Sequence, residues 1–325
     1  MTPRSLKGFS LLTLEELSPA ETEYLIDRAI ELKRLKRERV FEHNLRDRTI
    51  CLVFLKPSTR TRAAFFVAAS DEGAKVEFFE EKDLRFGIKE SVKDIARVLG
   101  RMFDGIAFRG FDHGVVEELA KYAGVPVWNA LSDDHHPTQV LADMMTLKEE
   151  FGAIAGLKLA YVGDGRNNIG RSLIIAACKM GLGLRIVAPK PLQPAAAYVS
   201  QYVKGAAHPA ANVTVTDDIE AGVAGCDAVY GDIWLSMGEE HLVGERIPML
   251  RPYRIDEAVL KKTGRSGSIF LHCLPSLHNL ETQFAREHPE AIDTAEELFE
   301  GPASRVFEQA ENRMHIIKAL MVATI

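Results

Sequence analysis

Short apolar runs that alternate with helix-forming segments constrain the fold of this chain most. In the first half, the predicted strands "ICLVFL", "KVEFF" and "GIAFR" alternate with helices at 61–70 and 90–102. The second half continues with strands "LKLAYVGD", "LRIVAPK", "AVYGDIW" and "SIFLHCLP", the first two separated by the helix "SLIIAACKMG". Parallel strands need such crossover helices, so the pattern predicts an α/β fold with mostly parallel sheets.

The chain is long enough for two domains. Its 325 residues exceed the size at which a single core usually stops growing. We expect a first domain at 1–136, a connecting helix at 137–150 and a second domain at 151–303. Pro137 at the helix start and Gly152 after its end favour that connecting helix. A last helix, within 304–325, is expected to pack back on the first domain.

Charge and cysteine usage exclude several classes of protein. The formal net charge of -6 argues against a nucleic-acid binder, which needs a basic surface. The four cysteines lie far apart without a C-x-x-C, so neither a disulfide framework nor a zinc site is indicated. No apolar run approaches membrane-spanning length. We therefore expect a cytoplasmic protein with reduced thiols.

A basic cluster, "KRLKRER" (33–39), ends a predicted helix at 18–39. RNA binding through this cluster is one alternative for the function of the chain. We interpret it instead as a solvated helix face, which is the usual place for a run of charges.

The stretch "FLKPSTRTRAAFFVAA" predicts an anion site. Ser58 is a good N-cap residue at the point where an apolar strand gives way to a helix. The backbone N–H groups of Thr59, Arg60 and Thr61 would then face an anion, with Arg62 on the same helix face as Thr59. The alternative is an ordinary capped helix with two exposed arginines.

Two further places supply hydrogen-bond donors. Arg109 ends a predicted strand in "FRGF", and His136 and Gln139 stand at the entry of the connecting helix in "HHPTQ". Ligands of open α/β sheets gather at the carboxyl ends of strands. A guanidinium, an imidazole and an amide suit a polarised carbonyl oxygen, although each residue alone is more often structural.

In the second domain, Asp232 and Cys273 each follow an apolar strand, in "GDIWLSMGEE" and "LHCLPSL". They are expected at neighbouring strand ends, with a carboxylate and a thiol facing one cleft. For Cys273, the alternative is an inert buried thiol.

A dinucleotide site is disfavoured. "VGDGRNNIGRS" has the spacing G-x-G-x-x-x-x-G, whereas the dinucleotide fingerprint is G-x-G-x-x-G. Lys190 also ends the next strand, where a ribose-binding carboxylate is expected.

Seven motifs follow one another along the chain: "STRTR", "FRG", "HPTQ", "GDGRNNIG", "DIWLSMGE", "HCLP" and "ENRMHIIKA". Through these motifs the whole chain resembles the carbamoyltransferase family. "SMG" with "HCLP" is similar to the ornithine branch in particular. The resemblance implies transfer of a carbamoyl group from carbamoyl phosphate to the δ-amine of L-ornithine, with a carbamoyl phosphate-binding first domain and an ornithine-binding second domain. It also implies a homotrimer with shared active sites and a reaction that needs no metal or organic cofactor.

The resemblance assigns site residues as well. Its carbamoyl phosphate positions are Ser58, Thr59, Arg60, Thr61, Arg62, Arg109, His136, Gln139, Cys273, Leu274 and Arg313. Its ornithine positions are Asn168, Asp232, Ser236 and Met237, and the catalytic set is Asp232, Cys273, Arg109 and His136.

One position departs from the family pattern. In "EKDLRFGIKES", Arg85 stands where many relatives carry the glutamine with which one subunit completes its neighbour's carbamoyl phosphate site. An arginine would still reach an anion. A carbamoyltransferase for another amine, such as putrescine, and a non-catalytic phosphate-binding protein remain the alternative functions.

Overall fold

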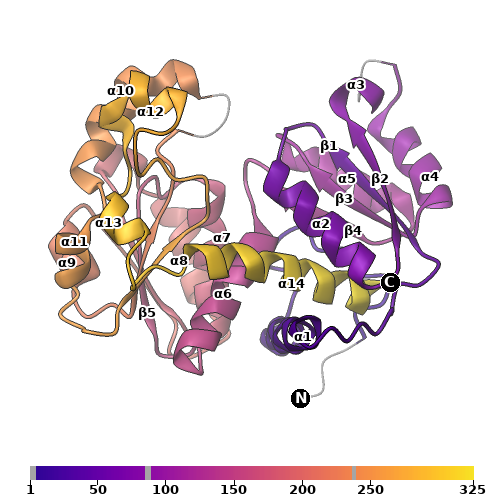
Figure 1. The fold of residues 1–325 in the computed structure, drawn as a ribbon, viewed down its shortest axis with the longest axis horizontal. Coiled ribbons are helices and arrows are strands. Elements are labelled where there is room, and N and C mark those ends of the chain that lie inside the picture. Colours follow the sequence, from indigo (N-terminus) through magenta and orange to yellow (C-terminus); the bar gives the residue numbers. More distant parts are fainter. Residues whose placement is uncertain (1–4, 85–88, 236–238) are drawn as a thin grey trace. The chain divides into compact units, whose positions relative to one another are not determined.

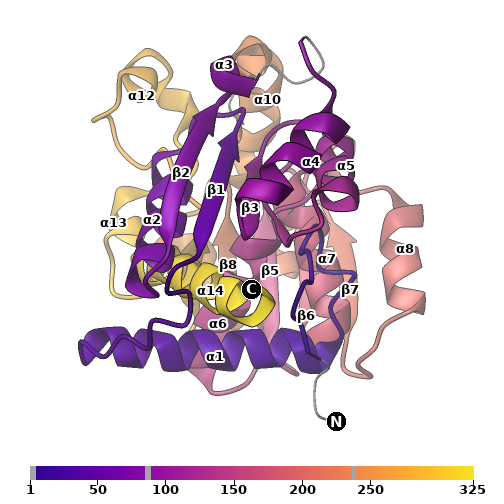
Figure 2. The same ribbon diagram turned by 90° about the vertical axis from the view of Figure 1, so that its right-hand side faces the viewer.

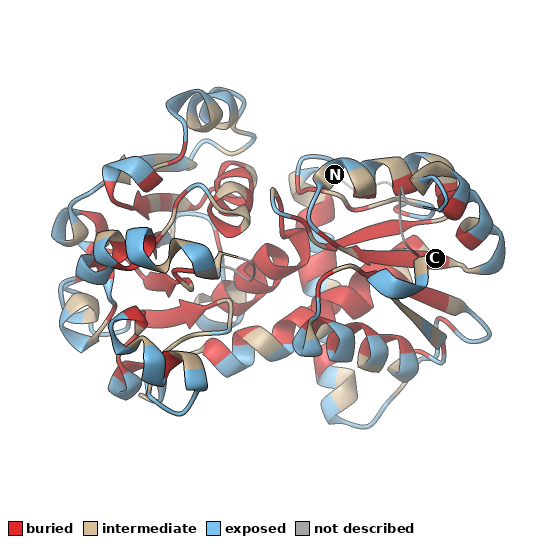
Figure 3. Ribbon diagram, turned by 90° about the horizontal axis from the view of Figure 1, so that it is seen from above, coloured by how far each residue is buried: buried red, intermediate tan, exposed pale blue. Residues whose placement is uncertain are grey.

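The structure, a computed structural model, describes residues 5–84, 89–235 and 239–325. The chain divides into two compact units, one of Met1–Met145 with Glu311–Ile325 and the other of Thr146–Ala310. Each unit holds one parallel sheet flanked by helices, which confirms the predicted fold class (Figure 1). In Figure 3 the inner strands of each sheet are largely buried, whereas the edge strands at Lys75–Glu80 and Asn212–Thr216 are partly exposed.

The first unit has a four-stranded sheet in the order β2-β1-β3-β4. Its strands are β1 (Thr49–Phe54), β2 (Lys75–Glu80), β3 (Gly105–Arg109) and β4 (Val127–Leu131). Its helices are α1 (Pro19–Arg37), α2 (Thr59–Asp71), α3 (Glu81–Leu84), α4 (Val92–Met102), α5 (His113–Ala123), most of α6 (Pro137–Phe151) and most of α14 (Val306–Thr324). The sequence pattern did not predict β4.

Helices cover both faces of this sheet. Figure 2 shows α2 on one side of strands β1 to β3 and α4 with α5 on the other. Ile95 and Leu99 of α4 pack with Leu119 of α5 against the apolar side chains of β1 and β3. On the opposite face, Phe65 of α2 stacks on Trp128, with 6.3 Å between ring centroids.

An ion pair and a hydrogen bond, each with a buried lysine, fix α14 within the first unit. Lys318 Nζ lies 2.5 Å from Asp71 Oδ2 at the end of α2. Lys33 Nζ donates to Asn312 Oδ1 at 2.7 Å, and the Lys33 side chain is buried. The prediction of a fully solvated "KRLKRER" face was therefore wrong at Lys33. Its helical spacing from Ile26 and Ala29 places it on the buried stripe of α1.

The second unit has a five-stranded sheet in the order β7-β6-β5-β8-β9. Its strands are β5 (Lys158–Val162), β6 (Gly183–Val187), β7 (Asn212–Thr216), β8 (Ala228–Gly231) and β9 (Ile269–His272). Its helices include α7 (Asn168–Met180), α8 (Ala196–Lys204), α9 (Ile219–Val223), α10 (Val243–Leu250), α11 (Glu257–Lys261), α12 (Gln283–Glu287) and α13 (Glu296–Phe299). Short 3-10 turns are η1 (Lys190–Leu192), η2 (Glu240–Leu242), η3 (Arg251–Tyr253) and η4 (Pro289–Ala291).

The core of the second unit lies against the central strands. Ala160 and Val162 of β5 pack with Phe270 of β9, Val223 of α9 and Leu298 of α13. Tyr161 alternates with Ala160 and Val162 and so points to the opposite face of the sheet. In the described part of the chain, no helix combines the length and apolar character needed to cross a membrane.

Candidate functional site

The first sheet brings the predicted anion-binding residues to one edge. Phe54 of β1 is paired with Arg109 of β3, so the segment after β1 and the Arg109 side chain both lie at the carboxyl ends of parallel strands. Ser58 caps α2, with the Thr61 N–H donating to Ser58 Oγ at 3.3 Å. This confirms the predicted cap. It also engages the N–H of Thr61, which was expected to face an anion.

The two arginines of "STRTR" are exposed on the first turn of α2. The Arg62 guanidinium carbon lies 3.6 Å from the centroid of the Phe78 ring, in a cation–π contact. Phe78 thus holds the exposed guanidinium against β2.

Arg109 belongs to a cluster of like charges. Burial lowers the pKa of its guanidinium to about 10, and repulsion by Arg313 and Arg60 adds to the effect. Its buried Nε has no hydrogen-bond partner among the described residues. Because the group is still a cation near neutral pH, an anion bound beside it would relieve the repulsion.

A chain of polar contacts fixes Arg313 and the entry of α6. Arg313 Nη1 donates to Gln139 Oε1 at 3.1 Å and lies 3.4 Å from His136 Nε2. Gln139 Nε2 donates in turn to Asp143 Oδ1 at 2.9 Å. Burial lowers the pKa of His136 well below its usual value, and the positive charges of Arg313 and Arg109 lower it further. A neutral imidazole therefore stands beside the guanidiniums.

In the second unit, Asp232 and Cys273 meet as predicted. Gly231 of β8 pairs with His272 of β9, so the two residues that follow lie side by side. The Cys273 thiol donates to Asp232 Oδ1 at 2.9 Å. Cys273 is half-buried, whereas Cys51, Cys178 and Cys226 are buried.

Two residues that the sequence reasoning missed also bind Asp232. The Tyr161 hydroxyl donates to Asp232 Oδ2 at 2.9 Å, and Asn167 Nδ2 donates to the same oxygen at 2.6 Å. Burial raises the pKa of Tyr161 well above its usual value, and the charges of Asp232 and Cys273 raise it further. The phenol therefore stays a donor.

The loop after β9 has an unusual backbone. Leu274 has a φ of 51° and precedes a cis bond to Pro275. Its N–H donates to His272 Nδ1 at 3.1 Å. Asn168 is the first residue of α7, and its backbone carbonyl accepts from Ser172 Oγ at 2.7 Å. The predicted positions Arg85, Ser236 and Met237 lie outside the described residues.

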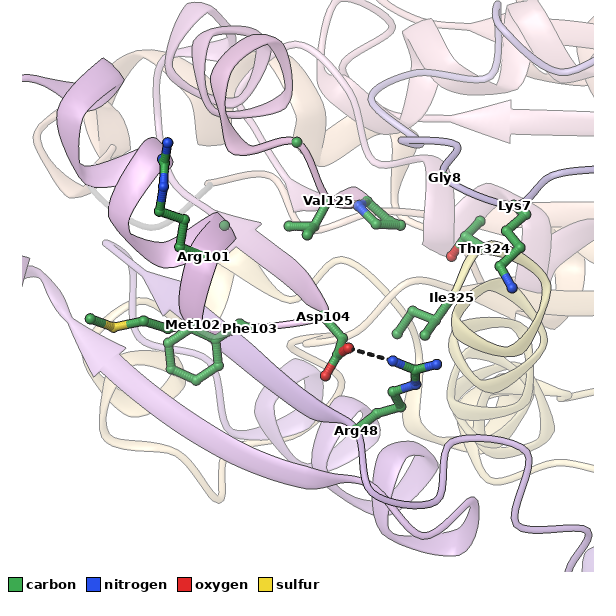
Figure 4. Close-up of a pocket in the computed structure, with 13 residues that line it drawn as sticks. Lys7, Gly8, Arg48, Arg101, Met102, Phe103, Asp104, Val125, Thr324 and Ile325 are labelled. Carbon is green, nitrogen blue, oxygen red and sulfur yellow. Dashed lines mark hydrogen bonds and ion pairs between the residues drawn. The ribbon is translucent and has the colours of Figure 1, made fainter.

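A cavity of about 460 Å³ in the first unit lies away from these residues. Its lining includes Asp104 and Pro126, which come just before strands β3 and β4, and an ion pair between Arg48 and Asp104 at 2.8 Å (Figure 4). The cavity is therefore at the amino-terminal edge of the sheet, opposite Arg109.

Family models match both parts of the chain. Residues 10–149 match the carbamoyl-P binding domain of aspartate/ornithine carbamoyltransferase, and residues 155–324 match its Asp/Orn binding domain. The chain belongs to the aspartate/ornithine carbamoyltransferase family. The sequence resemblance to this family is thereby confirmed.

Individual members of the family are similar over their full length. "Ornithine carbamoyltransferase 2, phaseolotoxin-insensitive" of Pseudomonas syringae pv. actinidiae is 54% identical over 99% of this chain and 98% of its own. The catabolic ornithine carbamoyltransferase of Staphylococcus aureus (strain MSSA476) is 50% identical over the same shares. The solved ornithine carbamoyltransferase from Pyrococcus furiosus superposes with a TM-score of 0.90 at 34% identity, covering 98% of both chains.

Within each unit, the structure brings together residues that the carbamoyltransferase resemblance implied, seven in all. Arg60, Arg109, His136, Gln139 and Arg313 interact in the first unit. Asp232 and Cys273 are in contact in the second. Tyr161 was missed because it stands within an apolar strand. A buried phenol nevertheless needs a hydrogen-bond partner, and this requirement was a usable signal.

Proposed function

We propose that this chain transfers the carbamoyl group of carbamoyl phosphate to the δ-amine of L-ornithine, giving L-citrulline and phosphate. The observation that carries the proposal is the group of three mutually repelling guanidiniums, Arg60, Arg109 and Arg313, beside the neutral imidazole of His136. Like charges are held together at a cost to the fold. An anionic substrate is the simplest reason for such an arrangement.

The charged groups suit the two ends of carbamoyl phosphate. The turn from Ser58 to Arg62 and the guanidiniums of Arg109 and Arg313 would bind the phosphate through charge-assisted bonds, worth about 1.5–3 kcal/mol each. Neutral His136 and Gln139 would donate to the carbonyl oxygen, which gains negative charge in the tetrahedral transition state. Cys273 and Leu274 would border the reacting carbon.

The amine of the substrate is the nucleophile in the chemical step. Its lone pair attacks the carbonyl carbon, the new C–N bond forms, and the bond from carbon to the phosphate oxygen breaks. Phosphate leaves with the electron pair, and the proton that the attacking nitrogen loses ends on the departing phosphate. Stabilisation of the oxyanion and of the leaving phosphate by fixed donors accounts for catalysis without a metal or organic cofactor.

Ornithine would be oriented by residues of the second unit. Asp232 is proposed to receive its α-ammonium, while Asn168 and the Ser236–Met237 segment receive its α-carboxylate. Both oxygens of Asp232 already accept two hydrogen bonds each, from Tyr161, Asn167, Ile233 and Cys273. An ammonium would therefore have to displace one of these donors, and we propose that it displaces the Cys273 thiol, the weakest hydrogen-bond donor of the four.

The wider setting is proposed from the family resemblance. We place the enzyme in the cytoplasm, in arginine metabolism, as a homotrimer in which Arg85 reaches a neighbouring subunit's site. Relatives named anabolic and catabolic are similar to this chain, so either direction is compatible. We assign carbamoyl phosphate binding to 1–136 with the helix in 304–325, and ornithine binding to 151–303.

The choice of amine tests this proposal. We expect ornithine to be the best substrate, putrescine at least about tenfold weaker and aspartate negligible. Putrescine leaves the carboxylate-binding donors unpaired, a defect of about 1–3 kcal/mol per buried group. The rate should rise above pH 7, because an alkyl amine titrates at about 10.4 and attacks only when neutral. Steady-state assays between pH 6 and 9 measure both; preference for another amine would contradict the assignment.

A further inference from the structure

The hydrogen bonds to Asp232 are divided between its two oxygens in a way that defines the orientation of the carboxylate. Within the described part of the chain, Oδ2 accepts side-chain donors from the β5–α7 region, Tyr161 Oη at 2.9 Å and Asn167 Nδ2 at 2.6 Å. Oδ1 accepts the neighbouring Ile233 N–H at 2.8 Å and the Cys273 thiol at 2.9 Å. Asp232 as a whole residue is 5% exposed, so water contributes little to the orientation of its carboxylate.

Each of the two donors to Oδ2 is itself fixed. Tyr161 is fully buried on the central strand of the sheet, and its hydroxyl also lies 3.2 Å from the carbonyl oxygen of Asp164. Asn167 is the N-cap of α7, because its Oδ1 accepts from the Gly170 N–H at 2.9 Å. The cap fixes the orientation of the amide, and its Nδ2 is thereby directed at Asp232.

We infer that Tyr161 and Asn167 are positioning residues that hold Oδ2 of Asp232, so that Oδ1 stays directed at the Cys273 thiol. The effect of this positioning on catalysis rests on the proposed function, because Asp232 and Cys273 are proposed there to act on the amine substrate. The two donors also withdraw negative charge from the carboxylate. Removing one of them should make the carboxylate repel a thiolate at Cys273 more strongly.

Asp164 is a further charged group near the phenol. It forms ion pairs with Arg166, at 3.1 Å, and with Arg246. The other three thiols of the chain are buried, and burial raises the pKa of each, that of Cys51 to about 12. Half-buried Cys273 is therefore the thiol that an alkylating reagent should modify first, which makes its reactivity a direct readout of the Asp232 carboxylate.

The test measures alkylation of Cys273 by iodoacetamide as a function of pH in the unliganded full-length protein, followed by peptide mass analysis. In Tyr161→Phe, we expect the midpoint of the alkylation profile to move to higher pH. Asn167→Ser keeps an N-cap side chain, loses the amide donor and should shift the midpoint in the same direction. Tyr230→Phe removes a buried hydroxyl from the adjacent strand and should leave the profile unchanged.

Steady-state kinetics supply the second readout. Tyr161→Phe should lower kcat about tenfold and raise KM for ornithine, as expected for loss of one hydrogen bond to a charged group, with KM for carbamoyl phosphate unchanged. Alkylation profiles of Tyr161→Phe and Asn167→Ser that coincide with wild type would overturn the inference. If wild-type protein makes no citrulline, the proposed function fails, and the alkylation profiles still decide whether these residues position Asp232.

Discussion

Asp232→Asn is expected to lower kcat/KM for ornithine at least about hundredfold. The substitution removes the charge proposed to bind the substrate ammonium, a bond worth about 1.5–3 kcal/mol. It also replaces one acceptor oxygen with an amide donor. In one orientation of the amide this donor faces the side-chain donors of Tyr161 and Asn167, and in the other it faces the Ile233 N–H and the Cys273 thiol. Steady-state assays with varied ornithine measure the loss, and KM for carbamoyl phosphate should stay near the wild-type value.

Asp217→Asn is the matched control for this variant. Asp217 is an exposed carboxylate of the same unit, in a surface ion pair with Lys190 at 3.6 Å. The Asp217→Asn enzyme should retain wild-type kinetics, because exposed ion pairs contribute little to stability. An Asp232→Asn enzyme that keeps its ornithine kcat/KM within about threefold would remove Asp232 from the substrate site.

Arg109→Met is expected to weaken carbamoyl phosphate binding about hundredfold, as two charge-assisted bonds of about 1.5 kcal/mol each are lost. The same change should leave the melting temperature of the unliganded protein unchanged or raise it. We expect this melting temperature because burial of the Arg109 charge and its repulsion by Arg313 and Arg60, which together depress the pKa of Arg109, also destabilise the unliganded protein. Calorimetric titration with carbamoyl phosphate and thermal unfolding measure the two effects.

Arg101→Met provides the comparison. Arg101 is an exposed arginine of the same unit, and its Nη1 donates to the Arg97 carbonyl oxygen at 2.9 Å near the opposite edge of the sheet. Its loss should not change affinity for carbamoyl phosphate. Wild-type affinity in Arg109→Met, or a large drop in its melting temperature, would show that Arg109 serves the fold and not an anion.

The parts of the fold and site that were predicted correctly depend on local signals. Ser58 was recognised as a cap because a polar residue between a strand and a helix is a short-range pattern. The placement of Asp232 and Cys273 at neighbouring strand ends was predicted because each follows a strand, and the carboxyl ends of adjacent parallel strands lie together.

The parts that were missed depend on three-dimensional context. Lys33 looked solvated by composition, yet helical spacing places it with Ile26 and Ala29 against Asn312, 279 residues away. Tyr161 looked like ordinary core in an apolar strand. Only the sheet order, with β5 beside β8, shows that its hydroxyl reaches Asp232.

Product analysis decides whether this protein carbamoylates ornithine. The purified protein is incubated with ¹³C-labelled carbamoyl phosphate and L-ornithine, and the products are identified by NMR and mass spectrometry. Carbamoyl transfer to the δ-nitrogen predicts labelled citrulline and inorganic phosphate in equal amounts, with the label bonded to the δ-nitrogen. Failure to form citrulline under conditions where carbamoyl phosphate binds, or label on the α-nitrogen, would contradict the account.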